Sequence, residues 1–184
     1  MNRYHHYLKI PGKFTPVFDA GAPFISGYDK SYQELVDWID GLGLTIGGAE
    51  VFHLEPNDPN YPNCLPIHSD SSAFDNHVKI NFVYSDTAST MNWYEYKDPT
   101  LLETLTTPIE TGYVTTVKDN CELVYSAEVG QPSLVNAGML HDISPVTSTR
   151  YCFSFPIWKN NKRLTWDSAV DIFKDYIVES IDND

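Results

Sequence analysis

The stretch RYCFSFPI, residues 150–157, decides the fold class because its side chains alternate in character. Positions 151, 153 and 155 are aromatic, while the positions between them carry Arg150, Cys152 and Ser154. Successive side chains of a β-strand point to opposite faces of the sheet. The stretch therefore predicts a strand with one core face and one polar face.

Similar short stretches, rich in β-branched and aromatic residues, precede it at residues 49–56, 77–85, 91–96, 112–117, 122–129 and 133–138. Asp119 and Asn120 lie between two of them and predict a hairpin turn. The chain holds 12 Tyr, 9 Phe and 4 Trp, which favours strands over a helical bundle. No helical pattern separates the strands, as a parallel α/β fold would require. We expect a mainly β fold with supporting helices, a jelly-roll-like double sheet.

Two helices are expected at the flanks of these strands. Residues 31–41 begin with Ser31 and Glu34 as a capping box, carry an apolar stripe and end at Gly41. A C-terminal helix is expected over about residues 166–181, where the apolar residues at helical spacing are Val170, Phe173, Ile177 and Ile181. With no repeat or linker, residues 1–184 are interpreted as a single domain with its β core at about 45–158.

Composition excludes some classes of protein. The net charge is −13 with only 12 Lys and Arg, which argues against nucleic-acid binding. The N-terminus has no apolar signal region, and no stretch approaches about 18 apolar residues, so no membrane segment is expected. Cys64, Cys121 and Cys152 are isolated and predict reduced thiols in a cytoplasmic protein. The oligomeric state stays open.

The candidate functional residues begin with His68 and Asp70 in LPIHSD, residues 65–70. Residues two apart on a strand share a face, so an imidazole and a carboxylate so placed can take adjacent positions around a metal. The alternative is a polar surface turn. The pair therefore needs a third ligand from elsewhere in the chain.

His141 and Arg150 supply the rest of the pattern. His141 lies 73 residues after His68, and Arg150 follows nine residues later. A guanidinium on a strand covered on both faces needs an anionic partner. That partner is either a carboxylate of the protein or the carboxylate of a ligand.

Taken together, His-x-Asp, a distal His and an Arg nine residues beyond it resemble the Fe(II)/2-oxoglutarate-dependent dioxygenases. The prolyl-hydroxylase-like and phytanoyl-hydroxylase-like branches are the most similar, and a compact single domain also looks like the small bacteriophage-encoded oxygenases. The resemblance covers roughly residues 45–158 and implies a double-stranded β-helix, a cupin-like jelly roll.

The resemblance implies a role for each of these residues. His68, Asp70 and His141 would bind Fe(II), and Arg150 would bind the far carboxylate of 2-oxoglutarate as a bidentate fork. Dioxygen and 2-oxoglutarate would be consumed, with release of succinate and CO2, while a C–H of the substrate is hydroxylated. Substrate specificity in such proteins lies in loops over the open end of the barrel, here residues 55–66 and 85–91. The composition of these loops does not identify the substrate, so a free amino acid, a peptidyl side chain and a small metabolite all stay open.

Three positions qualify the resemblance. Many relatives have Ser two residues after the Arg, where this chain has Cys152. Tyr84 lies sixteen residues after His68, where prolyl hydroxylases place a Tyr that binds the cosubstrate, and Asn81 is a second candidate. The period of two puts Asn81 and Tyr84 on opposite faces, so we expect only one of them to face the site.

Further histidines and aromatic residues have less direct interpretations. His53 could line the pocket or be structural, and Trp93 and Tyr94 could wall the substrate cavity or belong to the core. We expect His77 to face solvent, and His5 and His6 to lie in a flexible, uninvolved N-terminus.

Rival functions remain. A cupin-like protein with another metal reaction is disfavoured because the chain has no His-x-His. A non-enzymatic jelly-roll or cupin-like binding module would leave Arg150 unexplained. An inactive oxygenase homologue that binds iron without turnover is the third alternative.

Overall fold

The computed structural model describes residues 2–12, 14, 32–59, 63–75, 77–106 and 112–179. Within these residues the protein is mainly β, as the alternation predicted. The strands are β1 (His5–Leu8), β2 (Thr45–Ile46), β3 (Glu50–Leu54), β4 (Leu65–Ser69), β5 (Val78–Ser85), β6 (Thr90–Tyr96), β7 (Glu103–Thr106), β8 (Gly112–Thr115), β9 (Cys121–Glu128), β10 (Ser133–Asn136), β11 (Leu140–Ile143), β12 (Arg150–Lys159), β13 (Lys162–Arg163) and β14 (Ile177–Val178). The helices are α1 (Gln33–Gly41) and α2 (Trp166–Phe173), with short 3-10 turns η2 (Pro99–Leu101) and η3 (Lys118–Asn120).

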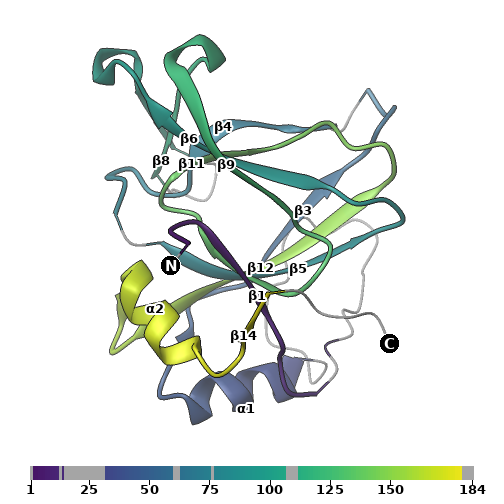
Figure 1. Cartoon of the computed structure of the whole chain (residues 1–184), viewed down its shortest axis with the longest axis vertical. Helices are drawn as coiled ribbons and strands as arrows, with labels where there is room; N and C mark the ends of the chain where they lie inside the picture. The colour runs from purple at the N-terminus through teal and green to yellow at the C-terminus, as the bar shows by residue number, and fades with distance from the viewer. Residues whose placement is uncertain are drawn as a thin grey trace.

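The strands form two antiparallel sheets. The eight-stranded sheet runs β13-β12-β5-β10-β1-β14, and β2 and β3 also pair with β12. The six-stranded sheet runs β7-β8-β4-β11-β6-β9. In Figure 1 the strands β4, β6, β8, β9 and β11 lie above β12, β5 and β1, and both helices lie on the far side of the eight-stranded sheet. All seven stretches predicted as strands contain one.

The main core lies between the eight-stranded sheet and the helices. Phe153 and Phe155 of β12 are 1% exposed and pack with Phe82 of β5, as well as with residues of α1 and α2. Because side chains alternate along a strand, the opposite faces of β12 and β5 turn toward the six-stranded sheet. The core face thus fixes which residues of these two strands can form a site between the sheets.

Both helices are shorter than predicted. Helix α1 begins at Gln33 with Tyr32 at its N-cap, and Ser31 lies outside the described residues. It ends before Gly43, whose positive φ of 70° takes the left-handed conformation that glycine tolerates, so Gly41 is its last helical residue and not its terminator.

The helix predicted over about 166–181 ends at Phe173, so its length was wrong. The amide of Tyr176 donates to the carbonyl of Phe173, and Ile177 then pairs with Leu8 as part of β14. Pairing with β1 satisfies backbone groups that a longer helix would have bonded internally. Ile181 lies outside the described residues.

Two other local predictions were wrong. Residues His5–Leu8 form β1, which pairs with β10, and His5 is 3% exposed, so this segment is part of the sheet. The turn at Asp119 and Asn120 is the 3-10 turn η3, but the strands on either side of it do not pair as a hairpin. Strand β8 pairs with β4 and β7, while β9 pairs with β6.

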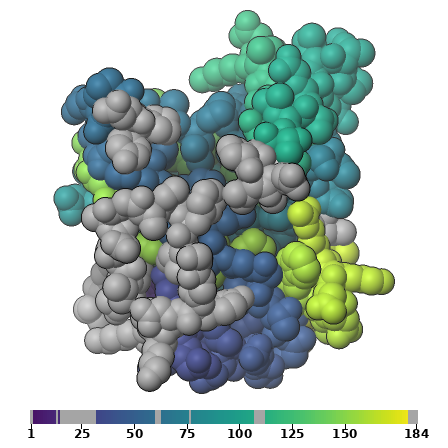
Figure 2. Space-filling view, turned by 180° about the vertical axis from the view of Figure 1, so that it is seen from behind, coloured from purple at the N-terminus to yellow at the C-terminus, as the bar shows by residue number. Residues whose placement is uncertain are grey.

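The ends of β6 and β9 nearest η2 and η3 project beyond the rest of the molecule, as the teal and green atoms show from behind in Figure 2. In the part of the chain that the structure describes, none of the helices has both the length and the apolar character to cross a bilayer.

Candidate metal centre

Strand pairing brings His68 and His141 together. His68 on β4 and His141 on β11 are direct partners in the antiparallel register, and their ring centroids are 4.4 Å apart. Asp70 follows β4, and its amide donates to the carbonyl of Ala137 at 2.9 Å. One ligand atom from each of His68, Asp70 and His141 lies within 4.8 Å of the other two. The structure thus places the three predicted ligands around one point.

Both imidazoles are oriented by the backbone. Nδ1 of His68 lies 2.7 Å from the carbonyl oxygen of Pro66, and Nδ1 of His141 lies 2.8 Å from that of Met139. A carbonyl oxygen only accepts hydrogen bonds, so Nδ1 of each ring carries the hydrogen. Nε2 is then the ring nitrogen left to bind a metal, an arrangement common among metal-ligating histidines.

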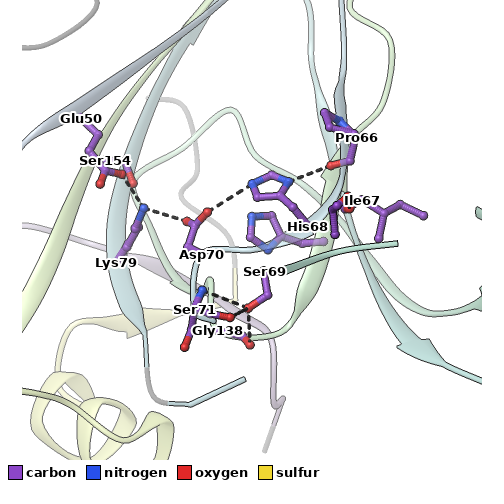
Figure 3. Close-up of polar contacts among 12 residues, drawn as sticks. Glu50, Pro66, Ile67, His68, Ser69, Asp70, Ser71, Lys79, Gly138 and Ser154 are labelled. Atoms are coloured by element: carbon purple, nitrogen blue, oxygen red, sulfur yellow. Dashed lines mark hydrogen bonds and ion pairs between the residues drawn. The ribbon is translucent and has the colours of Figure 1, made fainter. Parts of the chain in front are cut away.

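The charges around Asp70 favour its ionised form. Its Oδ1 lies 3.2 Å from Nε2 of His68, and its Oδ2 lies 2.7 Å from Nζ of Lys79 (Figure 3). Burial alone would raise the pKa of Asp70, but the Lys79 ammonium and the His68 contact outweigh it and hold this pKa well below its usual value.

The two imidazoles differ in their proton affinity. Burial lowers the pKa of His68, yet the hydrogen bond and negative charge of Asp70 outweigh it and raise this pKa above the usual value. Burial, followed by the proximity of His68, lowers the pKa of His141 to about 4, so that ring is neutral at physiological pH. Because Nδ1 of His68 carries the hydrogen, Nε2 of His68 and Oδ1 of Asp70 face each other with lone pairs at 3.2 Å. This contact is favourable only with a positive charge between the two atoms. A proton or a metal cation can supply it.

The donor set fits a divalent transition metal. Two imidazole nitrogens and one carboxylate oxygen form the 2-His-1-carboxylate pattern of non-haem iron sites, and imidazole and carboxylate also bind Zn(II). Ligands at about 2.1 Å from a metal and at right angles lie about 3 Å apart. The 3.2 Å between His68 and Asp70 matches that separation.

A small cavity lies against these three residues. Its volume is about 30 Å³, which is room for two or three waters. The side chains that line it are Phe52, Leu65, His68, Asp70, Lys79, Asn81, Met91, Ala137, His141, Ile143, Arg150, Cys152 and Ser154. The cavity is thus shared by β4 and β11 of one sheet and by β5 and β12 of the other.

Arg150 is a buried cation at this cavity. It is 1% exposed, and its Nε donates to the hydroxyl of Ser89 at 3.0 Å. Among the described residues no carboxylate oxygen lies within 4.0 Å of its guanidinium nitrogens. Cys152, two residues on, lines the same cavity beside Arg150. The guanidinium thus keeps its positive charge without a carboxylate partner among the described residues, which is the arrangement that an anionic ligand can complete.

Asn81 and Tyr84 are on opposite faces of β5. Asn81 lines the cavity, and its Oδ1 accepts a hydrogen bond of 2.6 Å from the hydroxyl of Ser154. Tyr84 packs against Phe153 in the helix-covered core, and its hydroxyl donates to the carbonyl of Phe14 at 3.0 Å. Of the two candidate cosubstrate ligands, the structure brings only Asn81 to the cavity.

The other candidates lie away from the cavity. Nε2 of His53 lies 2.6 Å from Glu55, and its ring stacks on Tyr151. Trp93 is fully buried in the core, and its indole N–H donates to the carbonyl of Asn136.

His77 is buried, contrary to the prediction that it faces solvent. It is 7% exposed, and neither ring nitrogen has a hydrogen-bond partner among the described residues. Burial, together with the Lys79 charge, lowers the pKa of His77 to about 3. The hydroxyl of Tyr94, a further candidate, donates to Asp142 and does not line the cavity.

Lys79 is the site residue that sequence reasoning missed. Its side chain is 3% exposed and its Nζ contacts both Asp70 and Glu50. These two carboxylates, which outweigh the effect of burial, raise its pKa. The signal was present, because Lys79 and Asn81 are two apart on a predicted strand and therefore share a face.

No protein-family model and no curated protein matches this chain.

Proposed function

We propose that this protein is an Fe(II)- and 2-oxoglutarate-dependent dioxygenase that hydroxylates a C–H of an amino acid, a peptidyl side chain or a small metabolite. One observation carries this proposal. His68, Asp70 and His141 line the same cavity as the buried guanidinium of Arg150. We further propose that the two facing antiparallel sheets are a double-stranded β-helix, the fold that the resemblance implies.

The chain's own residues define the proposed roles. His68, Asp70 and His141 would hold the metal, because their free ligand atoms face one point. Bound Fe(II) and 2-oxoglutarate would supply the oxidising chemistry, with dioxygen consumed and succinate and CO2 released. Arg150 would pair with the far carboxylate of 2-oxoglutarate, and Asn81 offers an amide beside it.

The charge balance of the cavity supports this pairing of ligands. With neutral imidazoles, the carboxylates of Asp70 and Glu50 balance the cations of Lys79 and Arg150. A divalent cation alone would leave the buried site with excess positive charge, and a dicarboxylate alone would leave it negative. Binding both together preserves neutrality, which lowers the cost of burying each.

One observation favours a second candidate, a non-enzymatic binding module or an inactive homologue. The ion pair of Lys79 with Asp70 balances the carboxylate without any metal. The dioxygenase therefore requires Asp70 to share its negative charge between Lys79 and a metal, whereas the binding module does not.

An anaerobic titration distinguishes the two candidates. Fe(II) plus 2-oxoglutarate should give the weak visible charge-transfer band of the chelate, and Zn(II) plus 2-oxoglutarate, as a control, should bind without a band because Zn(II) is d¹⁰. In air, 2-oxoglutarate should be converted slowly to succinate, and a true substrate should raise that rate. The absence of metal binding would exclude the dioxygenase, whereas a band without succinate would indicate the inactive homologue.

The setting proposed for this activity is the cytoplasm, because Cys64, Cys121 and Cys152 are all unpaired thiols in the structure. Dioxygen and a small or peptidyl substrate are the proposed partners.

A further inference from the structure

Lys79 links the candidate metal ligand Asp70 to a second carboxylate. Its Nζ lies 2.7 Å from Oδ2 of Asp70 and 2.5 Å from Oε2 of Glu50, so one ammonium group holds both side chains (Figure 3). The ammonium group of Lys79 also lies over the ring of Phe52, with Nζ 5.5 Å from the ring centroid. Lys79 is on β5 and Glu50 on β3, the two strands that flank β12.

Glu50 is therefore a carboxylate close to the metal centre that is not part of it. The group of possible ligands comprises His68, Asp70 and His141, and Glu50 falls outside it. The side chain of Glu50 is 27% exposed, compared with 3% for Lys79, so Glu50 has room to move and Lys79 has little. A divalent cation attracts carboxylates strongly, and a free Glu50 would be drawn toward it.

We propose that Lys79 is a positioning residue that keeps Glu50 out of the metal's coordination and leaves one oxygen of Asp70 to bind it. This inference rests on the proposed metal centre and deepens it. By occupying Oδ2 of Asp70 and Oε2 of Glu50, Lys79 limits the protein to three metal ligands. Positions for an exogenous ligand stay open, which distinguishes catalytic from closed structural metal sites.

Two consequences follow for a chain without the ammonium group. First, the metal centre loses a neighbouring positive charge, so divalent metals bind more tightly. Second, Glu50 becomes free to serve as a fourth ligand. Both effects depend on Glu50 and Asp70 remaining charged, so neutralising Glu50 should reverse the second effect.

Co(II) is a suitable probe because its visible absorption reports the number and geometry of its ligands. The variants are Lys79→Met, Lys79→Arg, Glu50→Gln and the double variant Lys79→Met with Glu50→Gln, each checked for folding by circular dichroism. Lys79→Gln replaces Lys79→Met if the latter does not fold. Co(II) affinity is measured by competition with a chelator, without 2-oxoglutarate.

Lys79→Met should bind Co(II) at least about 10-fold more tightly than the wild type and with a changed spectrum. The double variant should lose the part of the spectral change that a Glu50 ligand causes, so its spectrum should differ from that of Lys79→Met, while Lys79→Arg and Glu50→Gln alone should keep the wild-type spectrum. A wild-type spectrum in Lys79→Met would refute the role of Lys79, and a double variant whose spectrum equals that of Lys79→Met would refute its role in restraining Glu50.

The failure of this inference differs from that of the proposed function. Wild-type protein that binds no Co(II) overturns the metal centre and the role of Lys79 together. Wild-type protein that binds Co(II) but not 2-oxoglutarate overturns the dioxygenase, while the predicted responses of Lys79→Met still support its role at a metal site.

Discussion

The two walls of the cavity carry opposite chemistry. The six-stranded sheet contributes the imidazoles of His68 and His141, and Asp70 follows its strand β4. The eight-stranded sheet contributes the cations Lys79 and Arg150. One wall offers lone pairs to a cation, and the other offers positive charge to an anion. The proposed pairing of a metal with an anion therefore makes a separate prediction for each wall, although the ion pair of Lys79 with Asp70 links the two walls.

The largest expected effect comes from removing a ligand on the six-stranded wall. His68→Ala or His141→Ala should weaken Fe(II) or Co(II) binding by more than about 100-fold, because a three-ligand site loses a bond that the cavity cannot replace. His53→Ala is the matched control, since His53 is paired with Glu55 away from the cavity. Anaerobic equilibrium titration measures the affinity. Equal affinity in His141→Ala and the control would show that the triad is not a metal site.

On the opposite wall, Arg150→Ala should weaken 2-oxoglutarate by about 100-fold while changing metal affinity by less than about 3-fold, because only the distal ion pair is lost. Arg150→Lys should recover part of the affinity, since an ammonium keeps the charge without the planar fork.

Arg163→Ala is the control for this experiment, because the Arg163 side chain is 40% exposed and paired with Asp75. Isothermal titration with the metal already bound separates the two affinities. If Arg150→Ala weakened both ligands equally, Arg150 would be holding the fold and not an anion.

The two sheets should also share a response to acid. Burial, with the His6 charge adding to it, lowers the pKa of His5 in the eight-stranded sheet to about 4, from 6.5 in the unfolded chain. The unfolded state therefore binds a proton first as the pH falls, so stability is lost between pH 6.5 and pH 4 and not further below. His5 alone contributes about 3 kcal/mol to this loss.

Urea unfolding of metal-free protein across this pH range measures the effect. His141 in the other sheet, whose pKa is also lowered to about 4, should add to the same slope. His5→Gln should flatten the curve, because its amide can still bond Ser133 but does not titrate. An unchanged slope in His5→Gln would show that His5 is solvated in the folded protein.

The smallest effect should separate the two faces of β5. Asn81→Ala should weaken 2-oxoglutarate about 5-fold, the size of one neutral hydrogen bond, whereas Tyr84→Phe should change it by less than about 2-fold. Both variants are on one strand, so each controls for the other. A larger effect of Tyr84→Phe on 2-oxoglutarate affinity would mean that the face assignment of β5 fails in solution.

Much of the fold could be predicted from local patterns, because alternation along a strand depends only on neighbouring residues. Phe153 and Phe155 identified the core face of β12, and the other six stretches were recognised in the same way. Strand pairing could not be predicted locally. The turn at Asn120 joins strands that pair elsewhere, and β14 replaces the end of a predicted helix because Leu8, far away in the chain, offers it a partner.

The site residues likewise divide into those that the sequence pattern predicts and one that only the packing of the two sheets reveals. His68, Asp70, His141 and Arg150 could be proposed because their spacing matches a known pattern, and the structure brings all four to one cavity. Lys79 was missed because a lysine on a strand normally faces water. Its burial becomes evident only when the second sheet covers that face and brings Asp70 within 2.7 Å.

The register between β4 and β11 has a consequence for how the proposed metal centre would be loaded. His68 and His141 lie opposite each other only because strands 73 residues apart in sequence have already paired, and a slip of one residue would turn one ring away. During synthesis no binding point exists until β11 has left the ribosome and docked. Loading of the proposed metal centre should therefore follow folding instead of nucleating it, unlike in a zinc finger.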